Sequence, residues 1–154
     1  MTQALQDEIR KLLDRQGTTD PSFASIACRI VETFDVKIGV VYTLDPGTGM
    51  LKLRCHCGIP KDQAGKLRFL CMGKDIPGHV ATSRKPLQGC HGVPSKSHEP
   101  EFEIYGIGTL FVPMMHEDAL TGVLGIGKGF HHEYAPDEVE RLTSLGNLIA
   151  SYLK

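Results

Sequence analysis

The chain lacks the features that would assign it to several large classes of protein. No apolar run is long enough to cross a membrane, and residues 1–17 contain acids without an uninterrupted apolar core, so we expect neither a membrane span nor a signal peptide. The net charge of −1 gives no general attraction to nucleic acid or to an anionic membrane. Neither nucleic acid nor a membrane is therefore an expected partner.

Local catalytic and metal-binding signatures are missing too. The sequence has no Gly-x-Ser-x-Gly elbow, no HExxH motif and no CxxC pair. The five cysteines are odd in number and irregularly spaced, which argues against a disulfide framework and favours a reducing, cytoplasmic location. We therefore expect no metal site and no catalytic residue that sequence alone can name.

The 154 residues contain helical and strand periods that predict a single α+β domain. Leu5, Ile9, Leu12 and Leu13 recur at helical spacing, and Gly17 can end that helix. Asp20 is expected to cap a second helix. Strands are predicted at 38–44, 50–58, 67–72, 86–89, 106–115 and 122–128, and further helices at 59–67, 74–86 and 135–154.

The segment MLKLRCHCG, residues 50–58, alternates as a half-buried strand does. Strict alternation places Leu51, Leu53, Cys55 and Cys57 on one face and His56 on the other. Because cysteine is among the most buried residue types, we predict that both cysteines are core residues that bind no metal.

The segment GVLGIGKG, residues 122–129, resembles a phosphate-binding loop but ends in Gly129 where serine or threonine is needed. The alternative interpretation is a strand whose glycines let a neighbouring element approach closely. The chain that follows does not begin a helix, which favours the strand.

From about residue 21 to residue 153 the order of elements and four sequence blocks resemble the GAF domain family. The blocks are FASIACRIVETFDVKIGVVYTLDPGTGMLKLRCHCG, GKDIPGHVATSRKPLQG, YGIGTLFVPMM and TGVLGIGKGFHHEYAPDEVERLTSLGNLIA. The resemblance implies a central antiparallel sheet of about six strands. It also implies that helices from both chain ends cover one face, and that the other face and its loops form a small-molecule pocket.

Particular branches of the GAF family can be compared residue by residue. Where bilin-binding members have Cys-His, this chain has Ser97 and His98, so the resemblance implies no covalent bilin. Where the branch that reduces free methionine-(R)-sulfoxide has two cysteines, this chain has Pro77 and Phe102. The cyclic-nucleotide branch is matched weakly, because Gly127 replaces its asparagine.

We therefore expect a cytoplasmic sensor or regulatory GAF domain, not an enzyme. It would bind an unidentified small ligand and relay the signal through its terminal helices to output domains or partner proteins. The residues expected at the pocket are His79, His98, Phe102 and Tyr105. The cofactor is unknown. The alternatives are a thiol-dependent small-molecule reductase that uses Cys71 and Cys90, and a ligand-free dimerisation module.

Residues 1–19 are expected to form an N-terminal helix and residues 20–154 the GAF-like domain. The first helix carries an apolar stripe although it is peripheral, and the last helix carries more apolar surface than one sheet face requires, with Leu145, Leu148, Ile149, Tyr152 and Leu153. Because exposed apolar stripes are uncommon on monomers and two-fold dimers are the commonest oligomers, we predict a homodimer through these helices.

Overall fold

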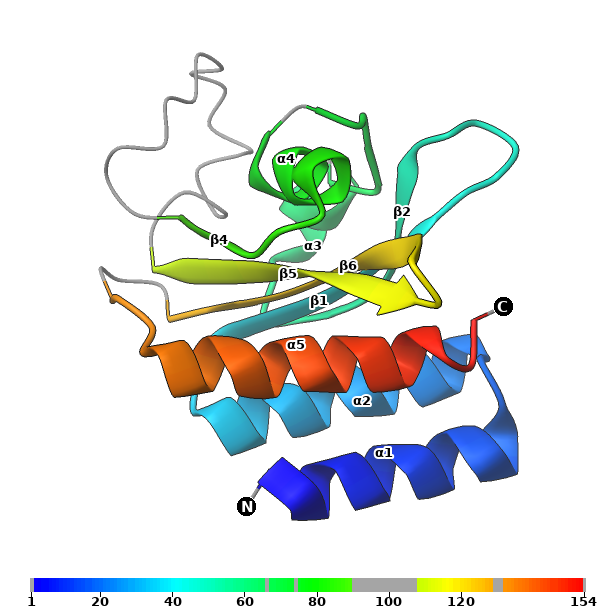
Figure 1. Ribbon diagram of the computed structural model, residues 1–154, viewed down its shortest axis with the longest axis vertical. Helices are drawn as coiled ribbons and strands as arrows, with labels where there is room; N and C mark the ends of the chain where they lie inside the picture. Colours follow the sequence, from blue (N-terminus) through cyan, green and yellow to red (C-terminus); the bar gives the residue numbers. More distant parts are fainter. Residues whose placement is uncertain (1, 66, 74, 90–107, 129–131, 154) are drawn as a thin grey trace.

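The computed structural model describes residues 2–65, 67–73, 75–89, 108–128 and 132–153. Its centre is a six-stranded antiparallel sheet in the order β3-β2-β1-β6-β5-β4, which confirms the predicted α+β class (Figure 1). The strands are β1 (Ile38–Leu44), β2 (Leu51–Cys57), β3 (Phe69–Leu70), β4 (Leu87–Gly89), β5 (Thr109–His116) and β6 (Ala119–Gly127). The helices are α1 (Thr2–Gln16), α2 (Asp20–Phe34), α3 (Lys61–Ala64), α4 (Asp75–Ser83) and α5 (Pro136–Ala150).

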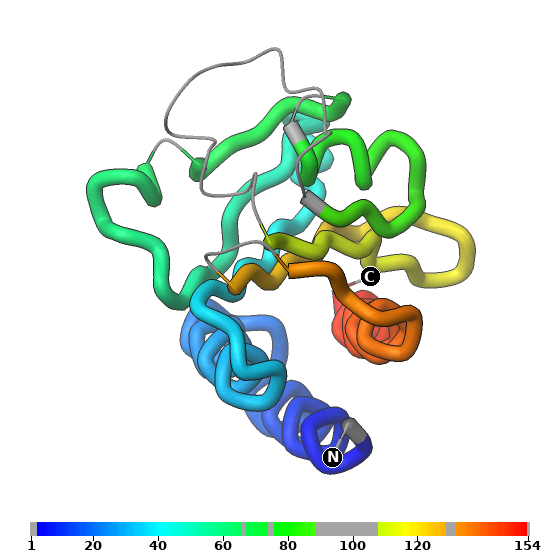
Figure 2. Tube along the Cα trace, turned by 90° about the vertical axis from the view of Figure 1, so that its left-hand side faces the viewer, coloured from blue at the N-terminus to red at the C-terminus, as the bar shows by residue number. Residues whose placement is uncertain are grey.

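The two faces of the sheet are covered by different helices. The helices from the chain ends lie together on one side, where α2 packs on β1 and β2, α5 packs on β5 and β6, and α1 packs on α2 and α5 (Figure 2). The short helix α4 lies over the opposite side. We call the first side the helix-side face and the second the loop-side face. In the described part of the chain, no helix has the length and apolar character needed to cross a bilayer.

Local signals place the terminal helices close to where the sequence predicts them. Gly17 ends α1 in a left-handed conformation (φ +70°), and its N–H donates to the Leu13 carbonyl at 2.8 Å. The cap of α2 is Thr19, whose Oγ1 accepts from the N–H of Ser22. The predicted cap, Asp20, is wrong by one residue because Asp20 already lies in the first turn, where a carboxylate favours the helix dipole.

The apolar stripes of the terminal helices are buried inside this chain. Leu5, Ile9 and Leu13 of α1 and Leu145 and Ile149 of α5 belong to one core with the helix-side residues of the sheet. Four apolar residues of these two stripes stay partly exposed, namely Leu12, Leu148, Tyr152 and Leu153. The surface available for the predicted dimer is therefore smaller than the sequence suggests, and the dimer stays a prediction.

Strand β2 contains an irregularity that strict alternation does not predict. The register of β1 against β2 shifts between Val41 and Tyr42, because Val41 pairs with Cys55 and Tyr42 with Leu53, which leaves Arg54 as an extra residue in a β-bulge. Leu53 packs on the loop-side core, whereas Cys55 belongs to the helix-side core. The prediction that Leu51, Leu53, Cys55 and Cys57 share one face is therefore wrong.

The bulge is held from the helix side by the extra residue itself. The guanidinium of Arg54 stacks 4.7 Å from the ring centroid of Phe23. It also donates to the Thr18 carbonyl and to Oδ1 of Asp20, both at 3.4 Å. These contacts with α2 and the turn before it hold the Arg54 side chain on the helix side, and Cys55 follows on the same side.

Candidate functional site

The central row of the loop-side face crosses five strands. Val40 pairs with His56 on one side and with Gly125 on the other, Gly125 pairs with Phe111, and Phe111 pairs with Leu87. Directly paired residues of an antiparallel sheet point to the same face, so these five lie in one line. Four of them are apolar or lack a side chain, and His56 is the titratable member.

An aromatic ring fills the middle of this row. A Cβ built on Gly125 would lie 2.2 Å from Cε1 of Phe111, so the Phe111 ring lies across the glycine. Phe111 is fully buried. The strand interpretation is thus confirmed for residues 122–127: β6 continues to Gly127, and Gly125 admits a neighbouring side chain.

A second aromatic residue closes the loop-side face further along β1. Tyr42 is fully buried, and its hydroxyl donates to the Leu67 carbonyl at 2.8 Å. This contact ties the sheet to the segment between α3 and β3. Tyr42 therefore fills the loop-side face at this end of β1, and His56 of β2 pairs with Val40 nearer the other end.

His56 carries an unsatisfied polar atom. Its Nδ1 is buried and has no hydrogen-bond partner among the described residues, although the side chain as a whole is only half-buried. A buried polar atom left without a partner costs about 1–3 kcal/mol. A bound molecule that supplied one hydrogen bond here would recover that free energy. The prediction that His56 and the two cysteines of β2 point to opposite faces is confirmed. His56 was not among the predicted site residues.

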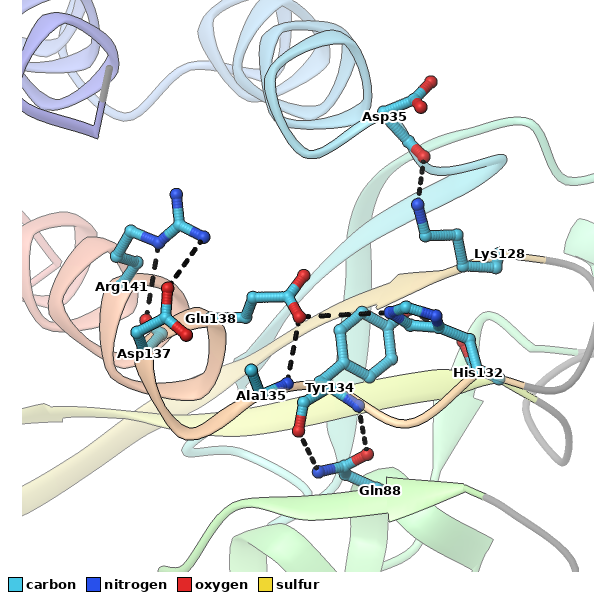
Figure 3. A network of polar contacts seen from close by, with 10 residues as sticks. Asp35, Gln88, Lys128, His132, Tyr134, Ala135, Asp137, Glu138 and Arg141 are labelled. Atoms are coloured by element: carbon cyan, nitrogen blue, oxygen red, sulfur yellow. Dashed lines mark hydrogen bonds and ion pairs between the residues drawn. The ribbon is translucent and has the colours of Figure 1, made fainter.

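A polar network connects the edge of this face to the start of α5 (Figure 3). The Gln88 amide of β4 makes two hydrogen bonds with the backbone of Tyr134, at 2.8 and 3.1 Å. The Tyr134 hydroxyl donates to the Gly108 carbonyl at 2.7 Å, and burial raises the pKa of this phenol. Tyr134, which lies just before α5, thus contacts both β4 and the residue before β5.

The first turn of α5 belongs to the same network. The Glu138 carboxylate accepts from the N–H of Ala135 at 2.9 Å, which is the one bond of a capping box that does not need a polar side chain at Ala135. Nε2 of His132 lies 3.9 Å from the same carboxylate, and its ring packs edge-on against Tyr134 at 4.6 Å (Figure 3). Glu138 and His132 therefore hold the start of α5, and His132 packs on Tyr134, which bonds to Gln88 of β4.

The predicted pocket residues fall in different parts of the chain. His79 lies on α4 and is exposed, as a residue at a rim would be, so its role stays a prediction. His98, Phe102 and Tyr105 lie outside the described residues, and so does the predicted bilin position at Ser97.

The cysteines are distributed over both sides of the sheet. Cys55 is buried, as predicted, and burial raises the pKa of its thiol to about 12. Cys57 is only half-buried, and Cys28 and Cys71 are exposed. Cys90 lies outside the described residues. Within the described ranges, no group of three or more His, Cys, Asp or Glu side chains is arranged to hold a metal ion.

A groove of about 350 Å³ lies on the outer side of the molecule, between α1 and α2. It is lined by Glu8, Ile9, Lys11, Leu12, Arg15, Ser25 and Arg29. Most of these side chains are exposed, and Arg29 already pairs with Glu8 at 3.6 Å. The groove therefore offers exposed charged walls in place of the enclosed apolar surface typical of small-molecule sites.

A model of the GAF domain family matches residues 18–154. The chain belongs to the GAF domain family. The predicted family and the predicted sheet with terminal helices on one face are both confirmed by this match and by the structure. No curated protein has a sequence that matches this chain significantly.

Solved GAF structures superpose on nearly the whole chain. The GAF domain of a phosphoenolpyruvate-protein phosphotransferase from Coxiella burnetii is 21% identical, with a TM-score of 0.83 over 98% of this chain and 91% of that one. A putative GAF sensor protein from Burkholderia vietnamiensis is 16% identical, with a TM-score of 0.79 over 98% and 92%. A free methionine-R-sulfoxide reductase from Neisseria meningitidis, solved with its substrate, is 13% identical, with a TM-score of 0.77 over 99% and 88%. At these identities the likeness establishes the fold alone.

Proposed function

We propose that this GAF domain is a cytoplasmic sensor or regulatory module that binds a small organic ligand on its loop-side face. The observation that carries the proposal is the buried, unpartnered Nδ1 of His56 in an otherwise apolar row. Sites for small molecules are mostly apolar with a few placed polar groups, and this row has that composition. The ligand expected here has an apolar body and one group that hydrogen-bonds to imidazole.

The relay from this site would run through Tyr134. Its contacts with Gln88 and Gly108 connect the edge strands to the segment before α5, and Glu138 fixes the first turn of α5. A ligand that shifted β4 or the start of β5 would therefore change the position of α5. Output domains or partner proteins would then read that helix.

The binding proposal is tested by a native mass spectrum of the protein as purified. We expect an additional small-molecule mass on the wild-type protein and its loss from His56→Leu. Because the imidazole nitrogen is unsatisfied without ligand, His56→Leu should be at least as stable as ligand-free wild-type protein. The matched control is His116→Leu, at the far end of β5, which should keep the additional mass.

Two outcomes would contradict the proposal. The same additional mass on His56→Leu would place the ligand elsewhere. A wild-type spectrum with no additional mass would favour the ligand-free module.

The reductase alternative is supported by the exposed position of Cys71 and by the name of one structural relative. It requires Cys71 and Cys90 to act together on an oxidised substrate. Turnover of free methionine-(R)-sulfoxide with a dithiol reductant, abolished by Cys71→Ser, would establish it. We propose that the protein is not an enzyme, so we expect no turnover.

Self-association is a separate proposal, and the burial of most of the apolar stripes of α1 and α5 leaves less surface for it. Leu12 is the apolar residue of α1 that remains half-exposed, in the groove beside α2. A two-fold contact through this charged surface would be small and sensitive to salt.

A further inference from the structure

We infer that Cys28 and Cys57 form a reversible disulfide that joins α2 to β2. Their Sγ atoms lie 3.8 Å apart although the residues are 29 positions apart in the sequence. The sulfur atoms must approach by about 1.8 Å to reach the length of a disulfide bond, a movement within reach of χ1 rotation at the exposed Cys28. This inference does not rest on the proposed ligand site.

A glycine explains why the two thiols are so close. Gly39 of β1 pairs with Cys57, and a Cβ at Gly39 would lie 2.9 Å from Cγ2 of Val31 and 3.3 Å from the Ala27 carbonyl oxygen. Because Gly39 has no side chain, α2 approaches the sheet closely at this point. Cys28 follows Ala27 on the helix and is carried to the end of β2.

The β-bulge at Arg54 is the second requirement. With strict alternation from Leu53, Cys57 would point to the loop-side face, away from α2. The extra residue turns both Cys55 and Cys57 toward α2 instead. The pair therefore depends on two irregularities, a glycine in β1 and a bulge in β2.

The exposure of the two thiols indicates which one reacts first with an oxidant. Cys28 is exposed and can meet an oxidant in solution. Cys57 is half-buried, and its pKa is raised first by burial, then by the contact with Cys28 and by the nearby Glu32 carboxylate. Cys55 is too deeply buried to compete, and the pKa of its thiol is about 12. Cys28 is therefore the attacking thiol and Cys57 the resolving thiol.

The oxidant that fits this arrangement is a small hydroperoxide. The Cys28 thiolate attacks one oxygen of the O–O bond, which breaks, and an alcohol or water leaves after it takes up a proton. The resulting sulfenic acid is attacked by the Cys57 thiolate, so that the S–S bond forms and hydroxide leaves as water. The two thiols lose two electrons and two protons in total, and a dithiol reductant reverses the reaction.

The experiment treats the full-length chain with hydrogen peroxide and maps its peptides without reduction. We expect a peptide pair joined through Cys28 and Cys57, with the protein lighter by two hydrogen atoms and restored by dithiothreitol. Cross-links that close loops of this size raise the melting temperature of such a domain by roughly 5–10 °C. Closure should also become faster as the pH rises toward the raised pKa of Cys57.

Variants separate this pair from general thiol oxidation. Cys28→Ser, at an exposed position, should fold normally and lose both the cross-link and the rise in melting temperature. Cys71→Ser removes another exposed thiol and should behave as wild type. Oxygen added at Cys28 without a cross-link would overturn the inference, and so would a bond from Cys28 to a different cysteine or between two chains.

Discussion

The contact between Gly125 and Phe111 makes the packing of the loop-side face directly testable. A Cβ at position 125 would lie 2.2 Å from Cε1 and 2.4 Å from Cδ1 of a fully buried ring. Gly125→Ala must therefore displace that ring inside a closed core. Overpacking of this kind costs about 1–3 kcal/mol, and two clashing ring atoms place the expected loss in the upper half of that range. The melting temperature should fall by roughly 5–10 °C for a domain of this size.

The assay is urea unfolding of Gly125→Ala in two backgrounds. In Phe111→Leu the smaller side chain leaves room for the new methyl group, so Gly125→Ala should cost at least about 1 kcal/mol less there than in wild type. Gly65→Ala is the matched control, because a Cβ at Gly65 meets no atom within 4 Å. Its effect should stay within about 0.5 kcal/mol.

Two results would contradict this packing of Phe111 on Gly125. An equal loss in both backgrounds would show that the ring does not lie across Gly125. A Gly125→Ala protein as stable as wild type would show that the Phe111 ring is not tightly packed against Gly125.

Three further predictions concern stability, thiol reactivity and assembly. Tyr134→Phe removes the hydroxyl bonded to the Gly108 carbonyl and should lower the free energy of unfolding by about 1–2 kcal/mol. Since the folded pKa of Tyr134 is raised, wild-type stability should fall as the pH rises above the ordinary phenol value of about 10, and this fall should be smaller in Tyr134→Phe; an identical alkaline profile would contradict the assignment. Under native conditions at mildly alkaline pH, iodoacetamide should modify Cys71 quickly and Cys55 only after unfolding, because burial raises the pKa of Cys55 to about 12; equal rates would show that Cys55 is accessible. Light scattering should give twice 16.9 kDa for the dimer predicted through α1 and α5, and a lower mass for Leu12→Asp; a wild-type mass near 16.9 kDa that Leu12→Asp leaves unchanged would rule that dimer out.

The fold could be predicted because its signals are local and periodic. Leu5, Ile9 and Leu13 repeat at helical spacing, and the core buries that stripe. Gly17 ends α1 as expected because a left-handed residue is needed there. Element order then favoured an antiparallel sheet, which the structure confirms.

The faces of β2 could not be predicted, because an extra residue in a bulge leaves no mark on an alternating sequence. The alternating pattern places Arg54 on the same face as His56. Only its contacts with Phe23 and Asp20 show that it lies on the helix side. The same limit hid the Cys28–Cys57 pair, which depends on how closely α2 approaches Gly39. His56 was missed because the absence of a partner for a buried nitrogen becomes visible only in three dimensions.

The most direct test of ligand binding on the loop-side face is an NMR titration. Any small molecule released from the purified wild-type protein by denaturation would be added back to ligand-free protein, and backbone amide shifts would be followed. The account predicts that the largest changes occur at Val40, His56 and Gly125, with smaller ones at Tyr134. Changes centred on Glu8, Arg15 and the other residues of the α1–α2 groove, with the loop-side row unmoved, would contradict it.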